Sequence, residues 1–267
     1  MTPKHEFEHE VKRDVEARVR EGVKAVLKDV LQEEMAEHLE AGVAAFSAAL
    51  EGDLGRPVPG CPGWDLAALA GHLGGVHRWA RAAIVDGRPG ELDEAGPTDP
   101  EELRGWFADG AATLAATLRA TDPQASCWSF GPPPGTAAFW QRRMPHETTL
   151  HAWDAHAALG EDLPLDRDLA LDGVDEVVTV FVPRQIRLGR LAAPTHAVEL
   201  RATDAPPGVG PWQLFGGEGE AAEASVAAPA ATLLLLLWRR VPLDTDGACV
   251  EGDEGAARQV LASPLTP

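Results

Sequence analysis

A glutamate and a histidine four residues apart, Glu147 and His151, are the pair of side chains in this sequence best placed for chemistry. The surrounding pattern is typical of a helix, where positions i and i+4 share one face with Cβ atoms about 5–6 Å apart. A carboxylate and an imidazole in this arrangement can converge on one divalent cation. Asp154 falls on the same stripe. It can steady a ligand histidine, cap an adjacent helix or pair with an arginine.

The pair needs a third ligand from another part of the chain. A zincin motif would have histidines at both i and i+4 with a glutamate base between them, whereas here a glutamate holds the first position. The best candidate for the third ligand is His72, on a predicted amphipathic helix that runs from Trp64 to about Asp86. Three protein ligands leave coordination positions open on zinc, which is typical of a catalytic site.

An open position on the metal can take either a thiol or water. A coordinated thiol is deprotonated to a nucleophilic thiolate at neutral pH. That thiolate could add to an electron-poor double bond. Bond rotation and loss of the thiol would complete an isomerisation, and release of the adduct would complete a transfer. A metal-bound water would instead support hydrolysis.

Other reactive residue types are placed less favourably. Cys61 lies in a loop rich in proline and glycine with no base near it in the sequence. A nucleophilic role needs an activating partner, so we interpret this cysteine as structural. His146 faces about 100° away from its neighbour Glu147 on a helix, so it can line a pocket without being a ligand.

The candidate ligands require helices that face one another. Helical patterns cover residues 6–50 as one long helix or two in succession, then 64–86, 100–120 and the segment that bears Glu147. Helices joined by such loops predict a four-helix bundle, in which metal sites are assembled from facing helices. After Gly160, helical patterns near 168–187, 232–240 and 256–262 alternate with short runs at 196–203, 211–215 and 224–227. The sequence therefore predicts an α+β protein in three parts: a helical extension over 1–34, the bundle over 35–163 and a smaller α+β domain over 164–267.

Charge and composition limit the partners. The 42 acidic and 23 basic residues give a formal net charge of −19. This balance argues against binding nucleic acid or an anionic membrane, both of which select basic surfaces. Three widely spaced cysteines indicate no disulfide framework, and the charged N-terminus does not resemble a secretory signal. We therefore expect a cytoplasmic protein.

Several segments together resemble the mycothiol-dependent maleylpyruvate isomerase family, which belongs to a DinB-like group of metal-dependent four-helix bundles. The segments are 58–65 (VPGCPGWD), 70–74 (AGHLG), 146–154 (HETTLHAWD) and the leucine-rich stretch 233–240. The resemblance covers about 35–262 and does not reach residues 1–34. It implies a small α/β domain after the bundle.

By motif match, the resemblance implies a divalent metal, usually zinc, held by His72, Glu147 and His151. It also implies mycothiol as the thiol cosubstrate and a small electrophilic substrate that bears carboxylates. Arginines near the ligands in sequence are the expected partners of those carboxylates, since guanidinium groups pair with them at two points. These are Arg78, Arg142 and Arg143.

Two other functions remain open at this point. The same bundle group includes metal-dependent enzymes that could use water in place of a thiol, as a hydrolase would. A non-catalytic metal-binding or assembly protein is the other alternative, favoured by the valine stripe of the N-terminal helix. That stripe is a candidate homodimer contact.

Overall fold

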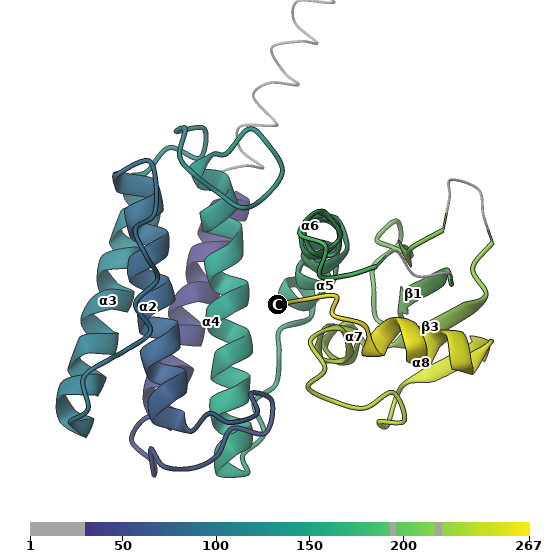
Figure 1. The fold of residues 1–267 in the computed structure, drawn as a ribbon, viewed down its shortest axis with the longest axis horizontal. Helices are drawn as coiled ribbons and strands as arrows, with labels where there is room; N and C mark the ends of the chain where they lie inside the picture. Colours follow the sequence, from purple (N-terminus) through teal and green to yellow (C-terminus); the bar gives the residue numbers. More distant parts are fainter. Residues whose placement is uncertain (1–29, 193–195, 217–220) are drawn as a thin grey trace, which may run out of the picture.

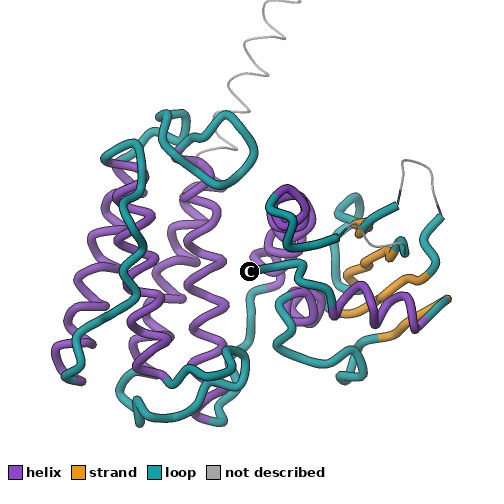
Figure 2. The backbone as a smooth tube through the Cα atoms, viewed as in Figure 1, coloured by secondary structure: helices purple, strands orange, loops and turns teal. Residues whose placement is uncertain are grey.

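The computed structural model describes residues 30–192, 196–216 and 221–267 (Figure 1). The predicted extension over 1–34, and with it the proposed dimer contact, lies almost entirely outside the described residues. The bundle consists of a helix over 30–49, α2 (Leu66–Val85), α3 (Pro100–Ala120) and α4 (Ala137–Leu159), which run side by side (Figures 1 and 2). The prediction of a four-helix bundle is confirmed.

Local sequence determines where the bundle helices begin. Asp65 caps α2 by accepting a hydrogen bond of 2.8 Å from the amide of Ala68. Asp99 caps α3 in the same way, and Pro100 follows it in the first turn, where a missing amide hydrogen has no cost. Inside the bundle, Phe107 is fully buried and lies 4.8 Å from Phe46, ring centroid to centroid.

Two glycines on α2 allow the loop between α2 and α3 to lie directly on the helix. A Cβ at Gly71 would meet the carbonyl oxygen of Glu94, and a Cβ at Gly75 would meet that of Asp93. Any larger residue at either position would push the loop outward. The glycines therefore fix the backbone of Glu94 beside His72.

The C-terminal domain combines a four-stranded sheet with helices. Its elements are α5 (Arg167–Glu176), a π-helical turn η1 (Val177–Phe181), α6 (Val182–Arg187), β1 (Val198–Ala202), β2 (Trp212–Leu214), β3 (Ala224–Ala228), α7 (Ala230–Leu237), β4 (Cys249–Gly252) and α8 (Glu254–Ala262). The strand order is β2-β1-β3-β4; β1 and β3 are parallel and both outer pairs are antiparallel. Helices α7 and α8 pack against β1 and β3, and α5 packs against α7. This domain confirms the α+β prediction.

Two features of this domain differ from the sequence prediction. Strand β4 was not predicted, because it is a short and largely exposed edge strand without an alternating pattern. Helix α7 ends at Leu237 and not at Arg240, because Arg239 has a left-handed backbone (φ 57°). The amide of Arg240 then returns to the carbonyl of Leu235 at 2.8 Å, the closing bond of a Schellman motif.

Charged side chains join the two domains. Arg142 on α4 donates to the carboxylates of Asp172 (2.8 Å) and Asp175 (2.9 Å) on α5. Next to it, Arg143 donates to Glu176 at 3.0 Å, and both side chains of this pair are buried. One face of α5 therefore neutralises the arginines of α4. Among the described helices, none combines the length and apolar character that crossing a bilayer requires.

Candidate metal centre and its pocket

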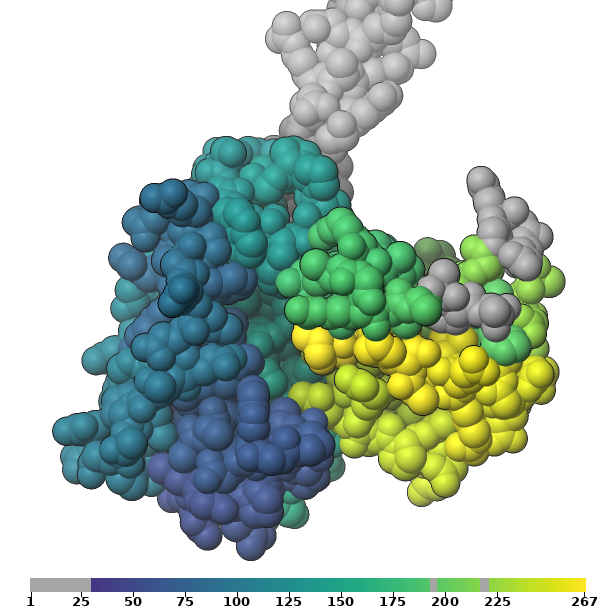
Figure 3. Space-filling view, in the orientation of Figure 1, coloured from purple at the N-terminus to yellow at the C-terminus, as the bar shows by residue number. Residues whose placement is uncertain are grey.

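A cavity of about 580 Å³ lies between the bundle and the C-terminal domain. A recess between the two halves of the molecule is visible in Figure 3. One wall comes from α2, where His72, Val76 and Trp79 share a face because they are four and seven residues apart. The facing wall comes from α4, again at helical spacing: Trp140, Arg143, Met144, Glu147 and His151. The far side belongs to the C-terminal domain, including Phe181, Trp238 and Arg240.

The structure brings His72, Glu147 and His151 together in this cavity. The Nε2 atoms of His72 and His151 lie 3.5 Å and 3.3 Å from Oε1 of Glu147. One potential ligand atom from each residue lies within 4.8 Å of the other two. Two imidazole nitrogens and a carboxylate oxygen form a donor set suited to zinc, which is bound by nitrogen and oxygen ligands at about 2 Å.

Both histidines are oriented by carboxylates at their other ring nitrogen. Glu94 accepts from Nδ1 of His72 at 2.6 Å, and Asp154 accepts from Nδ1 of His151 at 3.0 Å. A hydrogen bond at Nδ1 fixes the tautomer and leaves the Nε2 lone pair free for a metal. The residues present therefore fit a metal centre in which a carboxylate orients each ligand histidine through its Nδ1 atom.

Cys61, His151 and Asp154 form a second group whose ligand atoms are close together. Arg240 decides against a cation there. Its Nε and Nη2 atoms donate to the two oxygens of Asp154 at 2.9 Å and 2.7 Å. A metal in this position would face the guanidinium cation and compete for oxygens already in use. The group that contains His72 is therefore the better candidate.

The charges of the centre support one another. Burial raises the pKa of Glu147, but the Arg143 guanidinium and the hydrogen bonds with His151 and His72 outweigh it and hold that pKa well below its ordinary value. Burial lowers the pKa of His151, yet Asp154, Cys61 and Glu147 together raise it well above its usual range. These contacts favour the protonated form of His151. A metal held at its Nε2 would have to displace that proton.

Comparison with known proteins assigns the chain to a family. Residues 36–156 match the mycothiol maleylpyruvate isomerase N-terminal domain, and residues 168–259 match the C-terminal domain of the same family, MDMPI. The chain belongs to the mycothiol maleylpyruvate isomerase family. This confirms the family resemblance that the sequence motifs indicated, and with it the prediction of an enzyme of this type.

Solved structures agree with the assignment. The crystal structure of the mycothiol-dependent maleylpyruvate isomerase has a TM-score of 0.57 and 15% identity, and the match covers 83% of this chain and 94% of that one. A mutant of that isomerase in which one histidine is replaced by alanine matches with a TM-score of 0.55 at the same identity and coverage. At this identity the likeness shows the fold alone. No curated protein matches the sequence closely enough to count as a relative.

The three arginines expected to bind substrate have different positions. Arg143 lines the pocket but already contacts Glu147 and Glu176. Arg142 points to α5, as described above. The guanidinium of Arg78 lies 3.8 Å from the ring centre of Trp106 and donates to the backbone carbonyl of Trp106 at 2.6 Å. The structure therefore does not bring Arg78 or Arg142 to the pocket.

The sequence did not indicate several of the residues that line the pocket. Cys61, interpreted as structural, lines the pocket with its Sγ 3.4 Å from Nη2 of Arg240. His146 does not line this pocket and instead lies 2.7 Å from Asp172. Glu94 gave no sequence signal, because it lies in an irregular loop. The C-terminal domain adds three further arginines to the lining: Arg184, Arg190 and Arg239.

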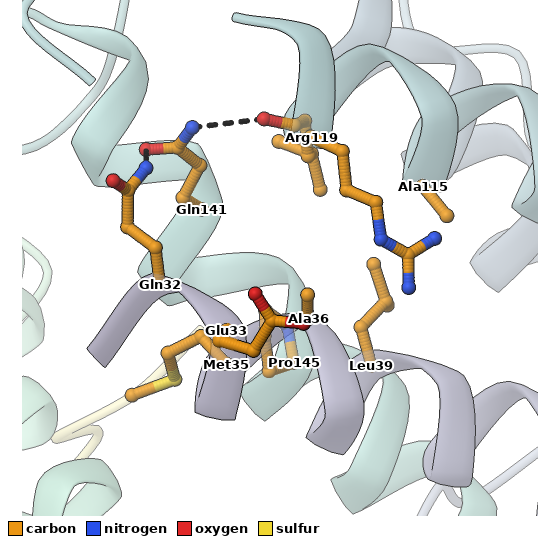
Figure 4. A pocket seen from close by; sticks show the side chains of 10 residues that line it. Gln32, Glu33, Met35, Ala36, Leu39, Ala115, Arg119, Gln141 and Pro145 are labelled. Atoms are coloured by element: carbon orange, nitrogen blue, oxygen red, sulfur yellow. Dashed lines mark hydrogen bonds between the residues drawn. The ribbon is translucent and has the colours of Figure 1, made fainter. Parts of the chain in front are cut away.

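A second cavity, of about 360 Å³, lies between the start of the 30–49 helix, the end of α3 and the first half of α4 (Figure 4). Gln32 donates to Gln141 across it at 3.3 Å. Its described lining contains one carboxylate, Glu33, and one guanidinium, Arg119, with neither histidine nor cysteine. Within the described residues this cavity therefore offers no set of metal ligands.

Proposed function

We propose that the protein is a cytoplasmic, zinc-dependent enzyme that uses mycothiol to isomerise, or to transfer the thiol to, a small electrophilic substrate bearing a carboxylate. Family membership supports the thiol and the general reaction class. The proposed ligands are His72, Glu147 and His151.

One observation carries this proposal above the others. Two histidine Nε2 atoms and one carboxylate oxygen converge in an open cavity, and each histidine is fixed at Nδ1 by a carboxylate. A purely structural zinc site would normally be closed by four protein ligands. Three ligands beside a cavity of about 580 Å³ leave room for a thiol and an electrophile.

When bound, a divalent cation would supply the Lewis acidity that keeps a coordinated thiol deprotonated at neutral pH. The protein's own residues prepare this site. Glu94 and Asp154 orient the two histidines, and Arg143 holds Glu147 ionised. Trp64 packs against His72, with ring centroids 4.7 Å apart and the two rings tilted by 49°. Arg240 keeps Asp154 ionised through two hydrogen bonds.

The first test is the metal content of the purified protein, measured by elemental analysis beside a His72→Ala variant. His196→Ala is the matched control, because His196 pairs with Glu223 in the C-terminal domain, outside the pocket. We expect about one zinc per chain in the wild type and the control, with clear loss in His72→Ala. Turnover of maleylpyruvate by the zinc-loaded protein should then require added mycothiol.

Contrary results separate the alternatives. Equal metal content in the wild type and His72→Ala would contradict the three-ligand centre. Substrate turnover without any added thiol would instead favour a hydrolase. Metal binding without turnover of either kind would favour a metal-binding assembly protein.

A further inference from the structure

The pocket carries excess positive charge on the side formed by the C-terminal domain. This is unexpected in a chain with 42 acidic and 23 basic residues. Arg184, Arg190 and Arg239 line this side. Among the residues that the structure describes, none of the three has a carboxylate within ion-pair distance, whereas Arg143 and Arg240 are both paired. Free guanidinium groups that face a cavity are suited to bind an anion.

Local structure places Arg184 and Arg190 together. Arg184 lies on the last turns of α6, and Gly189, with φ 68°, ends the helix in a left-handed conformation. The amide of Arg190 then returns to the carbonyl of Gln185 at 3.0 Å, which closes a Schellman motif and fixes the backbone of Arg190. Arg184, which is half-buried, and Arg190, which is exposed, thus line the pocket from one helix end.

The electrostatics of this helix end favour an anion. Burial lowers the pKa of Arg184, and repulsion from Arg190 and Arg187 lowers it further. Like charges held close to one another without an acid are stabilised by a bound carboxylate, which removes their repulsion. Arg187 is exposed and does not line the pocket.

An aromatic wall connects this positive side with the metal centre. The Arg184 guanidinium lies 4.8 Å from the ring centre of Phe130. Phe130 in turn lies 6.5 Å from Trp79, with the two rings only 25° from parallel. Trp79 is seven residues after His72 on the same face of α2. A cavity of about 580 Å³ corresponds to roughly twenty water-sized groups. That volume is open to an extended acid that reaches from the arginines along this wall.

We propose that Arg184 and Arg190 bind the carboxylate of a flat, apolar acid whose body lies along Phe130 and Trp79. The pocket then selects an aromatic or conjugated carboxylate in preference to a compact dicarboxylate. The electrophilic end of the bound acid then faces His72, Glu147 and His151, an orientation that rests on the proposed function. The arginine site for the carboxylate does not depend on that function.

Isothermal titration of the full chain with trans-cinnamate tests the site directly. We expect binding that weakens about tenfold or more in Arg184→Gln and in Arg190→Gln, the usual effect of losing a charge-assisted hydrogen bond. Arg258→Gln is the matched control, since it removes the same charge from the C-terminal domain at an exposed residue outside the pocket, and it should bind like the wild type. Cinnamamide, with the same shape and no charge, and maleate, with charge and no apolar body, should both bind at least tenfold more weakly.

The proposal is overturned if Arg184→Gln and Arg190→Gln bind cinnamate like the wild type, or if maleate binds more tightly than cinnamate. A His72→Ala variant separates failure of the arginine site from failure of the proposed function. Cinnamate binding that survives in His72→Ala supports the arginine site whatever the reaction proves to be. Binding lost in His72→Ala and kept in Arg184→Gln would mean that the carboxylate binds the metal, which contradicts the proposal.

Discussion

Replacing Asp154 with asparagine tests whether the carboxylate behind His151 supports the metal centre. The Asp154 side chain is fully buried and accepts four hydrogen bonds: one of 3.0 Å from His151, two of 2.9 and 2.7 Å from Arg240, and one of 3.6 Å from the Cys61 thiol. Asparagine has one acceptor oxygen, and its NH₂ group cannot accept. At least one of these donors must therefore lose its partner, and the buried guanidinium loses its counter-charge.

Two separate losses follow from this geometry. Breaking a buried ion pair on one side costs about 3–5 kcal/mol. Because asparagine keeps one acceptor, we expect the free energy of unfolding to fall by about 3 kcal/mol, near the lower end. Losing the carboxylate behind a ligand histidine typically weakens metal binding about 10- to 100-fold. We therefore expect the zinc affinity of Asp154→Asn to fall by that factor.

Competition with a chromogenic chelator measures zinc affinity, and urea denaturation measures stability. Glu94→Gln is the matched control, since Glu94 makes the same contact with His72 but is about half exposed. It should weaken zinc binding in the same direction and cost less than about 1 kcal/mol of stability. A folded Asp154→Asn protein whose zinc affinity stays within about twofold of the wild type would refute the argument.

Three further predictions concern acid stability, the docked loop and the core. Burial raises the pKa of Asp172, but hydrogen bonds from His146 and Arg142 lower it from 3.8 to about 2. The stabilisation that ionised Asp172 gives the folded protein is therefore complete above about pH 4 and is lost as the pH falls towards 2. Asp172→Asn should therefore make the free energy of unfolding, measured with urea, less dependent on pH between 4 and 2. It should cost about 1 kcal/mol at pH 7, because the pKa shift implies roughly 2.4 kcal/mol and the one-third exposure of Asp172 reduces this. An unchanged acid profile would contradict this. Gly75→Ala should displace the loop that packs on α2 and lower zinc affinity in the chelator assay, despite the better helix propensity of alanine; unchanged affinity would show that the loop gives way without consequence. Phe107→Ala should cost about 3–5 kcal/mol in urea denaturation, because the ring is fully buried; a cost below about 1 kcal/mol would mean that the core closes around the gap.

The periodicity of α2 and α4 shows why part of the site could be predicted from sequence. Each helical residue turns the chain by about 100°. Glu147 and His151 therefore share a face, and Arg143, four residues before Glu147, falls on it too. Arg78 is six residues after His72, about 240° round the helix, so it faces α3. The same arithmetic, applied to each arginine, would have removed Arg78 and Arg142 from the expected substrate contacts.

Other parts of the site depend on contacts between distant segments. Glu94 reaches His72 only because a loop packs on α2, and Cys61 reaches Arg240 only when the two domains meet. Arg184 and Arg190 lie more than thirty residues beyond the last ligand, at a helix end fixed by Gly189. No local pattern indicates which cavity such residues line.

The charged contact between α4 and α5 also bears on how the molecule moves. A hinge between α4 and α5 could open the cleft only by separating Arg143 from Glu176 and Arg142 from Asp172. Exposing a buried charge pair in this way is opposed by several kcal/mol. We therefore expect helix α4 and the C-terminal side of the pocket to move as one unit. Ligand entry would then depend on side chains and loops at the mouth of the pocket.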